Sequence, residues 1–422
     1  MNKSDSLYSI YVQILKEELV MAMGCTEPIA ISYACAKATQ VLDHLPDRIV
    51  VKASGSIIKN VKSVIVPHTN GLKGIEVAAA AGALYGDADA KLEVLSNATR
   101  DQIEELPEYV QNTNITVQHI EQGHVFDLEI NVYYEQEHAS VRIVDTHTNI
   151  VQIEKDWKVV FEDKTTNLEH KADHSALIMK QIWDFSQTVD IDDVKEILDR
   201  QITCNMDIAN EGIHNSYGAN IGHVILNMDS DCVKTRAKAY AAAGSDARMN
   251  GCELPVVINS GSGNQGMTTS LPVIVYAKEL NVSKEMMLRA LVVSNLITIH
   301  MKTGIGRLSA YCGAISAGCG AGAGICYLYG GRAYEISHVI VNAVAINSGV
   351  VCDGAKASCA AKIASAVEAG LLGLQMQKNG KQFYGGDGLV EKGVENTIRN
   401  IGELAKKGMR ETDKTIIQIM TR

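Results

Sequence analysis

Long stretches rich in glycine and alanine restrict what this chain can fold into. Two of them run from Ala237 to Gly244 and from Gly313 to Gly331. Small side chains allow two helices, or a helix and a cofactor, to approach each other closely. Because the whole chain has only four Phe and two Trp, we expect a helical core built from Ala, Val, Ile, Leu and Met.

The order of hydrophobic patterns predicts an α+β protein. A helical pattern runs from Leu7 to Met23, and a second helix opens at Pro28 and continues to Val41. Strand patterns dominate from Arg48 to about Val160, interrupted by helices at 74–85 and 100–111. The rest is mostly helical. We therefore expect an all-helical, Gly/Ala-rich catalytic domain of residues 1–44 and 170–422, with an inserted α+β domain, a mixed sheet plus helices, at 45–169.

Composition makes small molecules the expected ligands. The net charge is −10 and no basic runs occur, which argues against nucleic acid and anionic membrane surfaces as partners. The most apolar stretch, Ile336 to Val351, is too short and polar to span a bilayer. Ten cysteines and a polar N-terminus predict a reduced, cytoplasmic protein. At this size a homodimer is a reasonable expectation.

Three late cysteines are candidate metal ligands. Cys352 and Cys359 are seven residues apart, which on an unbroken helix is a rise of about 10.5 Å. Asp353-Gly354 follows Cys352 and predicts a break in the backbone between them. Cys312 would join this pair as a distant ligand. Spacing alone leaves both metal binding and plain packing open, because no compact Cys-x-x-Cys pair is present.

The other cysteines have a plainer interpretation. Cys319 and Cys326 continue the seven-residue spacing of Cys312, but one helix would spread the three over roughly 21 Å, too far for one cluster. Free cysteine is among the most buried residue types. We expect core packing for six of them: Cys35, Cys204, Cys232, Cys252, Cys319 and Cys326.

Cys25 lies in the sequence Gly24-Cys25-Thr26-Glu27-Pro28, in the elbow between the two predicted N-terminal helices. Free N–H groups and the positive end of the helix dipole favour a thiolate at such a position. Cys25 is therefore a candidate base or nucleophile. The alternative is that Thr26 caps the helix and Cys25 only fills space.

The segment Ser260-Gly261-Ser262-Gly263-Asn264-Gln265-Gly266 is a candidate anion-binding loop. It follows a strand-like stretch, Pro255 to Asn259, and precedes a predicted helix, so its backbone amides can form a nest. The Gly-x-Gly-x-x-Gly string also raises a dinucleotide site, but no βαβ unit surrounds it. We favour a substrate carboxylate as its ligand, and a turn without a ligand stays open. We assign no role to His300, Lys302 or Arg307.

Taken together, these motifs resemble the L-cysteine desulfidase family, which is related to the iron–sulfur L-serine dehydratases. The motifs are the Cys25 elbow, the Ser260–Gly266 loop, Tyr311-Cys312-Gly313, and Cys352-Asp353-Gly354 followed by Cys359. They keep their order over nearly the whole chain. The resemblance implies a 4Fe–4S cluster and no pyridoxal phosphate.

The resemblance also implies roles for individual residues. Cys312, Cys352 and Cys359 match the cluster ligands, and Cys25 matches the proton acceptor. No cysteine follows Cys359, so the fourth iron would be open to substrate. The implied substrate-binding residues are Thr26, Glu27, Ser260, Gly261, Ser262, Gly263, Asn264 and Gln265.

The implied reaction eliminates sulfide from L-cysteine and gives pyruvate and ammonia. The same machinery would eliminate water from L-serine, so a serine dehydratase is the first alternative. A non-catalytic iron–sulfur sensor of redox state or iron is the second, although no basic DNA-reading helix supports it. A relative with structural, metal-free cysteines is the third.

Overall fold

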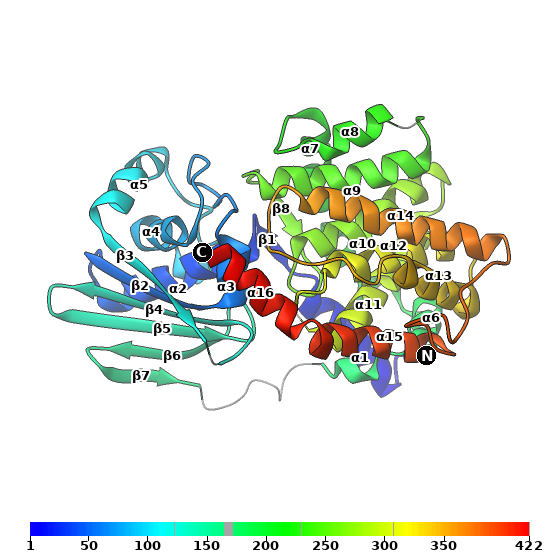
Figure 1. Cartoon of the computed structure of the whole chain (residues 1–422), viewed down its shortest axis with the longest axis horizontal. Coiled ribbons are helices and arrows are strands. Elements are labelled where there is room, and N and C mark those ends of the chain that lie inside the picture. The colour runs from blue at the N-terminus through cyan, green and yellow to red at the C-terminus, as the bar shows by residue number, and fades with distance from the viewer. Residues whose placement is uncertain (122, 164–171, 229, 307, 422) are drawn as a thin grey trace.

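The computed structural model describes residues 1–121, 123–163, 172–228, 230–306 and 308–421. A sheet part and a helical part lie side by side (Figure 1). In the sheet part, strands β2 and β3 are parallel and the other neighbouring strands are antiparallel, so the sheet is mixed. Its order is β3 (Asn114–Ile120), β2 (Arg48–Ser54), β4 (Asp127–Tyr134), β5 (Glu137–Val144), β6 (Ile150–Lys155) and β7 (Lys158–Glu162). The predicted α+β fold class is confirmed.

Helices cover one face of this sheet and share a hydrophobic core with it. They are α2 (Thr26–Leu42), α3 (Gly55–Val61), α4 (Ile75–Tyr85), the 3-10 helix η1 (Ala88–Glu93) and α5 (Arg100–Asn112). Leu128, Ile130 and Val132 of β4 are fully buried in that core together with the apolar side chains of α2. Gly82 lets α4 lie close to α2, since a Cβ there would be 2.2 Å from the Ser32 carbonyl oxygen.

The predicted domain ranges stay a prediction. The packing of α2 concerns the first of these ranges. The predicted helical domain includes residues 1–44, yet α2 packs with the sheet. The other predicted boundary, at 169–170, lies outside the described residues.

The helical part is built around α12, a Gly/Ala-rich helix in contact with α10, α11, α13 and α14. A Cβ at Gly318 of α12 would lie 2.3 Å from the Ala366 carbonyl oxygen of α14, so small residues permit this packing. The elements are α1 (Ser6–Glu18), η2 (His174–Ala176), α6 (Met179–Thr188), η3 (Ile191–Asp193), α7 (Lys195–His214), α8 (Ile221–Met228), α9 (Val233–Met249), α10 (Gly263–Glu279), α11 (Lys284–Ile305), α12 (Gly313–Leu328), α13 (Ala333–Ile346), α14 (Cys359–Lys378), α15 (Val394–Glu403), η4 (Leu404–Gly408) and α16 (Arg410–Thr421).

The N-terminal segment differs from the single helix predicted for Leu7 to Met23. Helix α1 ends at Glu18, and Met21–Met23 forms strand β1, which pairs antiparallel with β8 (Pro255–Val257). Pairing with a distant strand overrides the local helical pattern here. It also places the Cys25 elbow beside the glycine-rich loop that follows β8.

The structure tests which cysteines pack in the core. Cys35, Cys252, Cys319 and Cys326 are buried, as predicted, whereas Cys204 is half-buried. The prediction is wrong for Cys232, which is exposed. It stands at the N-cap of α9, after a polar turn, where the side chain faces solvent.

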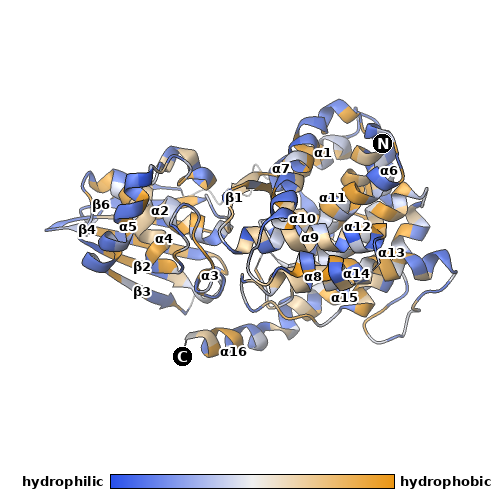
Figure 2. Ribbon diagram, turned by 90° about the horizontal axis from the view of Figure 1, so that it is seen from above, coloured by the Kyte–Doolittle hydropathy of each residue, from blue (hydrophilic) through white to orange (hydrophobic). Residues whose placement is uncertain are grey.

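Helix α16 returns from the helical part to the sheet part and packs against α3. Figure 2 shows it standing apart from the helical bundle, with hydrophilic and hydrophobic residues along its length. Its Ile417 lies so near α3 that a Cβ at Gly55 would be 2.5 Å from the Ile417 side chain. In the described part of the chain, we find no helix with the length and apolarity that crossing a bilayer requires.

Candidate active site

A cavity of about 110 Å³ lies between α3 of the sheet part and the helical part. Four helices begin at its wall: Cys25, Ser262 and Cys312 are the N-cap residues of α2, α10 and α12, and Cys359 is the first residue of α14. Each helix start presents free N–H groups and the positive end of a dipole. The cavity is therefore suited to anions.

Local backbone structure brings the three candidate metal ligands to this cavity. Tyr311 and Val351 form an isolated antiparallel bridge. Beside it, the N–H of Cys312 donates to the Val350 carbonyl at 3.1 Å, and that of Cys352 donates to the Ala310 carbonyl at 2.7 Å. The bridge therefore holds the two cysteines next to each other, although 40 positions separate them in sequence.

Cys359 reaches the same cavity because the chain turns between it and Cys352. Gly354 has φ +97°, a conformation that favours glycine, and a Cβ there would lie 2.2 Å from the Lys59 carbonyl oxygen. The predicted break at Asp353-Gly354 is confirmed. The Cys359 thiol donates to the Gly354 carbonyl at 3.6 Å, and α14 starts at this cysteine.

The thiols of Cys312 and Cys352 influence each other's protonation. The Cys312 thiol donates to the Cys352 sulfur, which lowers the pKa of Cys352 and raises that of Cys312 well above its usual value. Burial raises the pKa of Cys359. Binding of a metal requires thiolates and would release these protons.

The three cysteines on the cavity wall are the residues that could hold an iron–sulfur cluster. Within the described ranges, no three His, Cys, Asp or Glu side chains are grouped closely enough to bind one metal ion. A cluster differs, because each thiolate binds its own iron and the sulfurs stand farther apart. An all-thiolate set suits iron–sulfur chemistry, and the cavity is several times the 10–15 Å³ or so that one water needs.

Cys25 lies on the same cavity, but it is not the thiolate that its position at a helix start predicts. Its Sγ is buried and donates to Glu27 Oε2 at 3.4 Å. Burial, and then the negative charge of Glu27, raise the pKa of Cys25 far above its usual value. The desolvation of the thiolate outweighs the helix dipole, so Cys25 rests as a thiol that is hydrogen-bonded to a carboxylate.

Glu27 is the centre of a buried hydrogen-bond network. Its Oε2 also accepts from the Thr26 hydroxyl at 3.1 Å, and its Oε1 accepts from Asn60 Nδ2 at 2.9 Å. Among the described residues that line the cavity, Glu27 is the one acid. The hydrogen bond from Cys25 marks the path by which a proton would pass between that thiol and the carboxylate.

The glycine-rich loop forms another wall. Ser260 and Gly261 have φ +51° and +80°, and the loop leads into α10, where Ser262 is the N-cap. Strand β8 before it pairs antiparallel with β1, so the parallel βαβ unit of a dinucleotide site is not formed there.

Only some of the predicted substrate-binding residues line the cavity. Those that do are Glu27, Gly261, Ser262, Asn264 and Gln265. The Thr26 hydroxyl, which contacts Glu27, also lies 3.2 Å from the Gly261 carbonyl and shares its one proton between the two acceptors, and Ser260 donates to Asn259 Oδ1 at 2.8 Å. The Thr26 hydroxyl joins the elbow to the loop, whereas the Ser260 hydroxyl contacts its own neighbour in the chain. Gly263 makes room for Arg248, since a Cβ there would lie 2.4 Å from Arg248 Nε.

Sequence reasoning missed five residues of the site: Lys59, Asn60, Arg248, Lys302 and Lys362. Lys59 and Asn60 belong to α3, which was not predicted as a helix. Lys302 was considered and given no role, and Arg307, considered with it, lies outside the described residues. The basic cluster becomes visible only after the fold gathers its residues from four separate helices, α3, α9, α11 and α14.

The missed lysines support the cysteine-bearing loop. Lys59 Nζ donates to the Cys352 carbonyl at 3.3 Å, and Lys362 Nζ donates to the Val351 carbonyl at 2.8 Å. Lys362 also pairs with Asp353. Positive charge thus surrounds the place where thiolates and an anionic substrate would gather.

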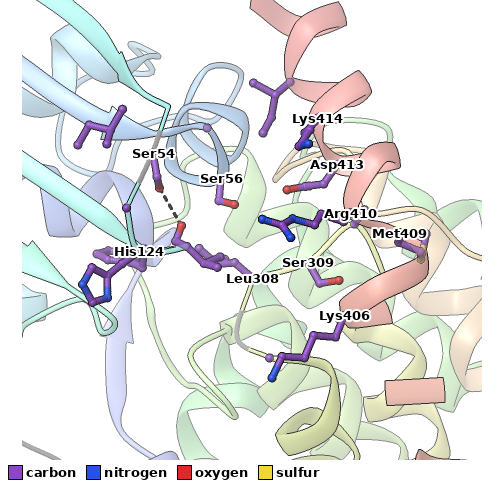
Figure 3. Close-up of a pocket in the computed structure, with 18 of the residues that line it drawn as sticks. Ser54, Ser56, His124, Leu308, Ser309, Lys406, Met409, Arg410, Asp413 and Lys414 are labelled. Atoms are coloured by element: carbon purple, nitrogen blue, oxygen red, sulfur yellow. Dashed lines mark hydrogen bonds between the residues drawn. The ribbon is translucent and has the colours of Figure 1, made fainter. Parts of the chain in front are cut away.

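A larger cavity of about 960 Å³ adjoins the first one and shares Leu308 and Ser309 with it. Figure 3 shows Lys406, Arg410 and Asp413 of the C-terminal segment on one side and Ser54 and Ser56 on the other. The larger cavity contains none of the candidate cysteines.

Comparisons with known proteins give the family. A family model described as serine dehydratase alpha chain matches residues 89–418. A UPF0597 protein of Desulfitobacterium hafniense is 56% identical over 422 residues, which are 100% of this chain and 98% of the relative. The chain belongs to the serine dehydratase alpha chain family and to the UPF0597 proteins.

Other UPF0597 relatives extend over the same length. The protein from Lachnoclostridium phytofermentans is 51% identical over 98% of this chain and 100% of the relative, and that from Treponema denticola is 44% identical over 100% and 99%. The serine dehydratase alpha chain match includes the three candidate ligands but begins after Cys25. Membership in this family indicates an amino-acid lyase, and serine dehydratases of the family use an iron–sulfur cluster.

Proposed function

We propose that this protein is an iron–sulfur-dependent L-cysteine desulfidase that releases pyruvate, ammonia and sulfide without pyridoxal phosphate. One observation carries the proposal: three thiols and the Cys25–Glu27 pair line a single cavity that is surrounded by positive charge. Elimination from an amino acid needs a base at Cα and an electrophile at the leaving atom, and these two groups would meet there.

Cys312, Cys352 and Cys359 would hold a 4Fe–4S cluster, leaving one iron without a protein thiolate. When bound, the cluster supplies a Lewis acid for the leaving sulfur of the substrate. The lysines around the cysteine-bearing loop offset the negative charge of three thiolates. Their backbone contacts also fix the position of Cys352.

Cys25 and Glu27 would together remove the α-proton. The hydrogen bond from Cys25 Sγ to Glu27 Oε2 gives the thiol proton a route to the carboxylate. The thiolate so formed accepts the proton from Cα while the Cβ–S bond breaks. This leaves aminoacrylate, whose imine tautomer reacts with water to give pyruvate and ammonia, and the sulfur leaves as sulfide.

The wall made by Gly261, Ser262, Asn264 and Gln265 would hold the amino acid in place. These residues start α10, and the helix start favours a carboxylate nearby. Thr26 contributes indirectly, since its hydroxyl joins the loop to the elbow that carries Cys25.

We propose L-cysteine rather than L-serine as the substrate on chemical grounds. Hydrosulfide leaves more readily than hydroxide, because S–H groups are much stronger acids than water, whose pKa is about 15.7. Sulfur is also the softer ligand for iron in a thiolate environment. L-Serine dehydration is the second candidate, favoured by the description of the family model.

The test is a comparison of kcat/KM for the two amino acids on anaerobically reconstituted protein. We expect faster elimination from L-cysteine. Faster elimination from L-serine would overturn the substrate and leave the lyase chemistry in place. A protein that binds about four irons but turns over neither amino acid would instead support the iron–sulfur sensor.

The remaining expectations concern the setting of the enzyme. We propose a small-molecule enzyme of the cytoplasm that is a homodimer, without nucleic-acid or membrane partners. The acidic net charge of −10 supports a small-molecule enzyme without nucleic-acid or anionic-membrane partners. Light scattering measures the mass of the protein in solution and tests whether it is a homodimer.

A further inference from the structure

Arg248 is a buried cation whose hydrogen bonds are incomplete. It lies near the end of α9, is 3% exposed, and lines the cavity that also contains Cys25 and Cys312. Its Nη1 donates to Asn264 Oδ1 at 3.1 Å. Its Nε is buried and has no hydrogen-bond partner in the described part of the chain.

No ion pair of Arg248 is found among the described residues either. A buried charge is costly unless it is paired and fully hydrogen-bonded, so a guanidinium left in this state indicates a missing anion. The one acid on the cavity wall, Glu27, already accepts from Cys25, Thr26 and Asn60. The anion for Arg248 would therefore come from outside the chain.

A second group on the wall of the same cavity lacks a hydrogen-bond donor, whereas Arg248 lacks an acceptor. Gln265 Oε1 is buried and accepts no hydrogen bond in the described structure. Gln265 follows Asn264, the partner of Arg248, in the first turn of α10. The cavity thus presents a cation that lacks an acceptor and an oxygen that lacks a donor.

Two glycines make room for these side chains. A Cβ at Gly263 would lie 2.4 Å from Arg248 Nε, and a Cβ at Gly313 would lie 2.7 Å from the Gln265 side-chain carbon. Both contacts are shorter than real Cβ atoms make. The starts of α10 and α12 therefore allow the guanidinium and the amide to reach the cavity.

We infer that Arg248 binds the α-carboxylate of an amino-acid substrate, while Gln265 Oε1 accepts from its α-ammonium group. This rests on the proposed function for the identity of the site as an amino-acid lyase, but not on which leaving group is eliminated. A guanidinium suits a carboxylate because it donates two parallel hydrogen bonds, a geometry that lysine cannot reproduce.

The consequence is a specificity rule. Compounds with a free thiol and amine but no carboxylate, such as cysteamine, leave Arg248 unpaired and bind poorly. Amides and esters of L-cysteine share this defect. The rule holds equally for L-cysteine and L-serine, because the side chain of the substrate is directed away from the carboxylate.

The test is binding of L-alanine, which has the α-amino and α-carboxyl groups but no leaving group. Calorimetric titration compares L-alanine with L-alaninamide on the wild-type protein, and then L-alanine on Arg248→Lys and Arg248→Met. We expect L-alaninamide, and L-alanine on both variants, to bind about 10- to 100-fold more weakly, as loss of a charged hydrogen-bond pair predicts. Arg200→Met, on the exposed surface of α7, is the matched control.

The ligand comparison uses only the wild-type chain, so it stands even where an Arg248 variant fails to fold. Equal binding of L-alanine and L-alaninamide, no binding of L-alanine, or full binding by folded Arg248→Met overturns the inference. Sulfide release is measured separately. If the wild-type protein turns over L-cysteine but Arg248→Met binds L-alanine as well as wild type does, the inference about Arg248 is wrong and the proposed function stands. If L-alanine binding depends on Arg248 but L-cysteine is not turned over, the inference stands and the proposed function is wrong.

Discussion

Lys59 and Asp413 form an ion pair with an N–O distance of 2.6 Å that joins α3 of the sheet part to the C-terminal helix α16. Lys59 is 2% exposed and its ammonium also donates to the Cys352 carbonyl. One buried lysine thus connects the cysteine-bearing loop to a helix that lies outside the helical bundle. The C-terminal helix is in this way part of the support of the site.

Asp413→Asn is therefore expected to destabilise the protein, because it leaves the ammonium of Lys59 buried without its counter-charge. The loss should be about 1–3 kcal/mol, below the full value for a buried pair since Asp413 is 23% exposed. Urea unfolding followed by circular dichroism measures it. Glu411→Gln, on the exposed start of α16, is the matched control, and an equal effect of both variants would contradict the role of the pair.

Replacement of a candidate ligand should remove the metal without unfolding the chain. Cys352→Ser is expected to lower the iron content of reconstituted protein from about four per chain to near zero, because three thiolates are needed to hold the cluster. Cys319→Ser changes a buried cysteine of α12 that does not line the cavity, and should keep its iron. Iron retained by the first variant, or lost equally by both, would count against the assignment.

Cys25 and Glu27 should affect turnover but not metal binding. Cys25→Ser and Glu27→Gln are each expected to lower kcat by about 10²- to 10⁴-fold, the usual contribution of a positioned base, with visible absorbance unchanged. Cys35→Ser, in the same helix, is the control. Full turnover by Cys25→Ser with an intact cluster would exclude Cys25 as the proton acceptor.

Asp246 gives a pH dependence that can be measured apart from the metal. Burial raises the pKa of this α9 carboxyl, which is 1% exposed, to about 6. The folded chain then holds the proton more tightly than the unfolded chain, whose Asp pKa is about 3.9. Its contribution to the free energy of unfolding therefore falls as pH rises from about 4 to about 6 and is constant above that.

Asp246→Asn should remove this fall. The free energy of unfolding of the variant, relative to wild type, is expected to rise by on the order of 2 kcal/mol between pH 4.5 and 6.5. Equilibrium urea unfolding across that range measures it, with exposed Asp101→Asn on α5 as the control. If the difference in the free energy of unfolding between variant and wild type does not change with pH, the raised pKa is contradicted.

Features that depend on local chemistry could be predicted from the sequence. Gly354 indicates a backbone break because few other residues adopt its φ of +97°, and the break does separate Cys352 from Cys359. The α+β class follows from hydrophobic periodicity in the same way. The resemblance of the ordered motifs to a known family added the prediction of the candidate metal ligands.

Features that depend on distant segments could not be predicted. Arg248 becomes part of the site only when α9 packs against α10, and Lys59 only when α3 approaches the loop of Cys352 and Gly354. The segment from Met21 to Met23 has a helical pattern, but its pairing with β8 makes it a strand. Burial decides the protonation of Cys25, and the sequence does not report the burial of a single side chain.

The central claim is elimination of sulfide at the cavity where the thiols and the Cys25–Glu27 pair meet. The most direct measurement is the amount of sulfide and of pyruvate released from L-cysteine by anaerobically reconstituted protein, alongside Cys352→Ser. The account predicts equal amounts of the two products from the wild-type protein and neither from the variant. Iron-loaded wild-type protein that releases no sulfide, or a metal-free variant that releases it at the same rate, would contradict the account.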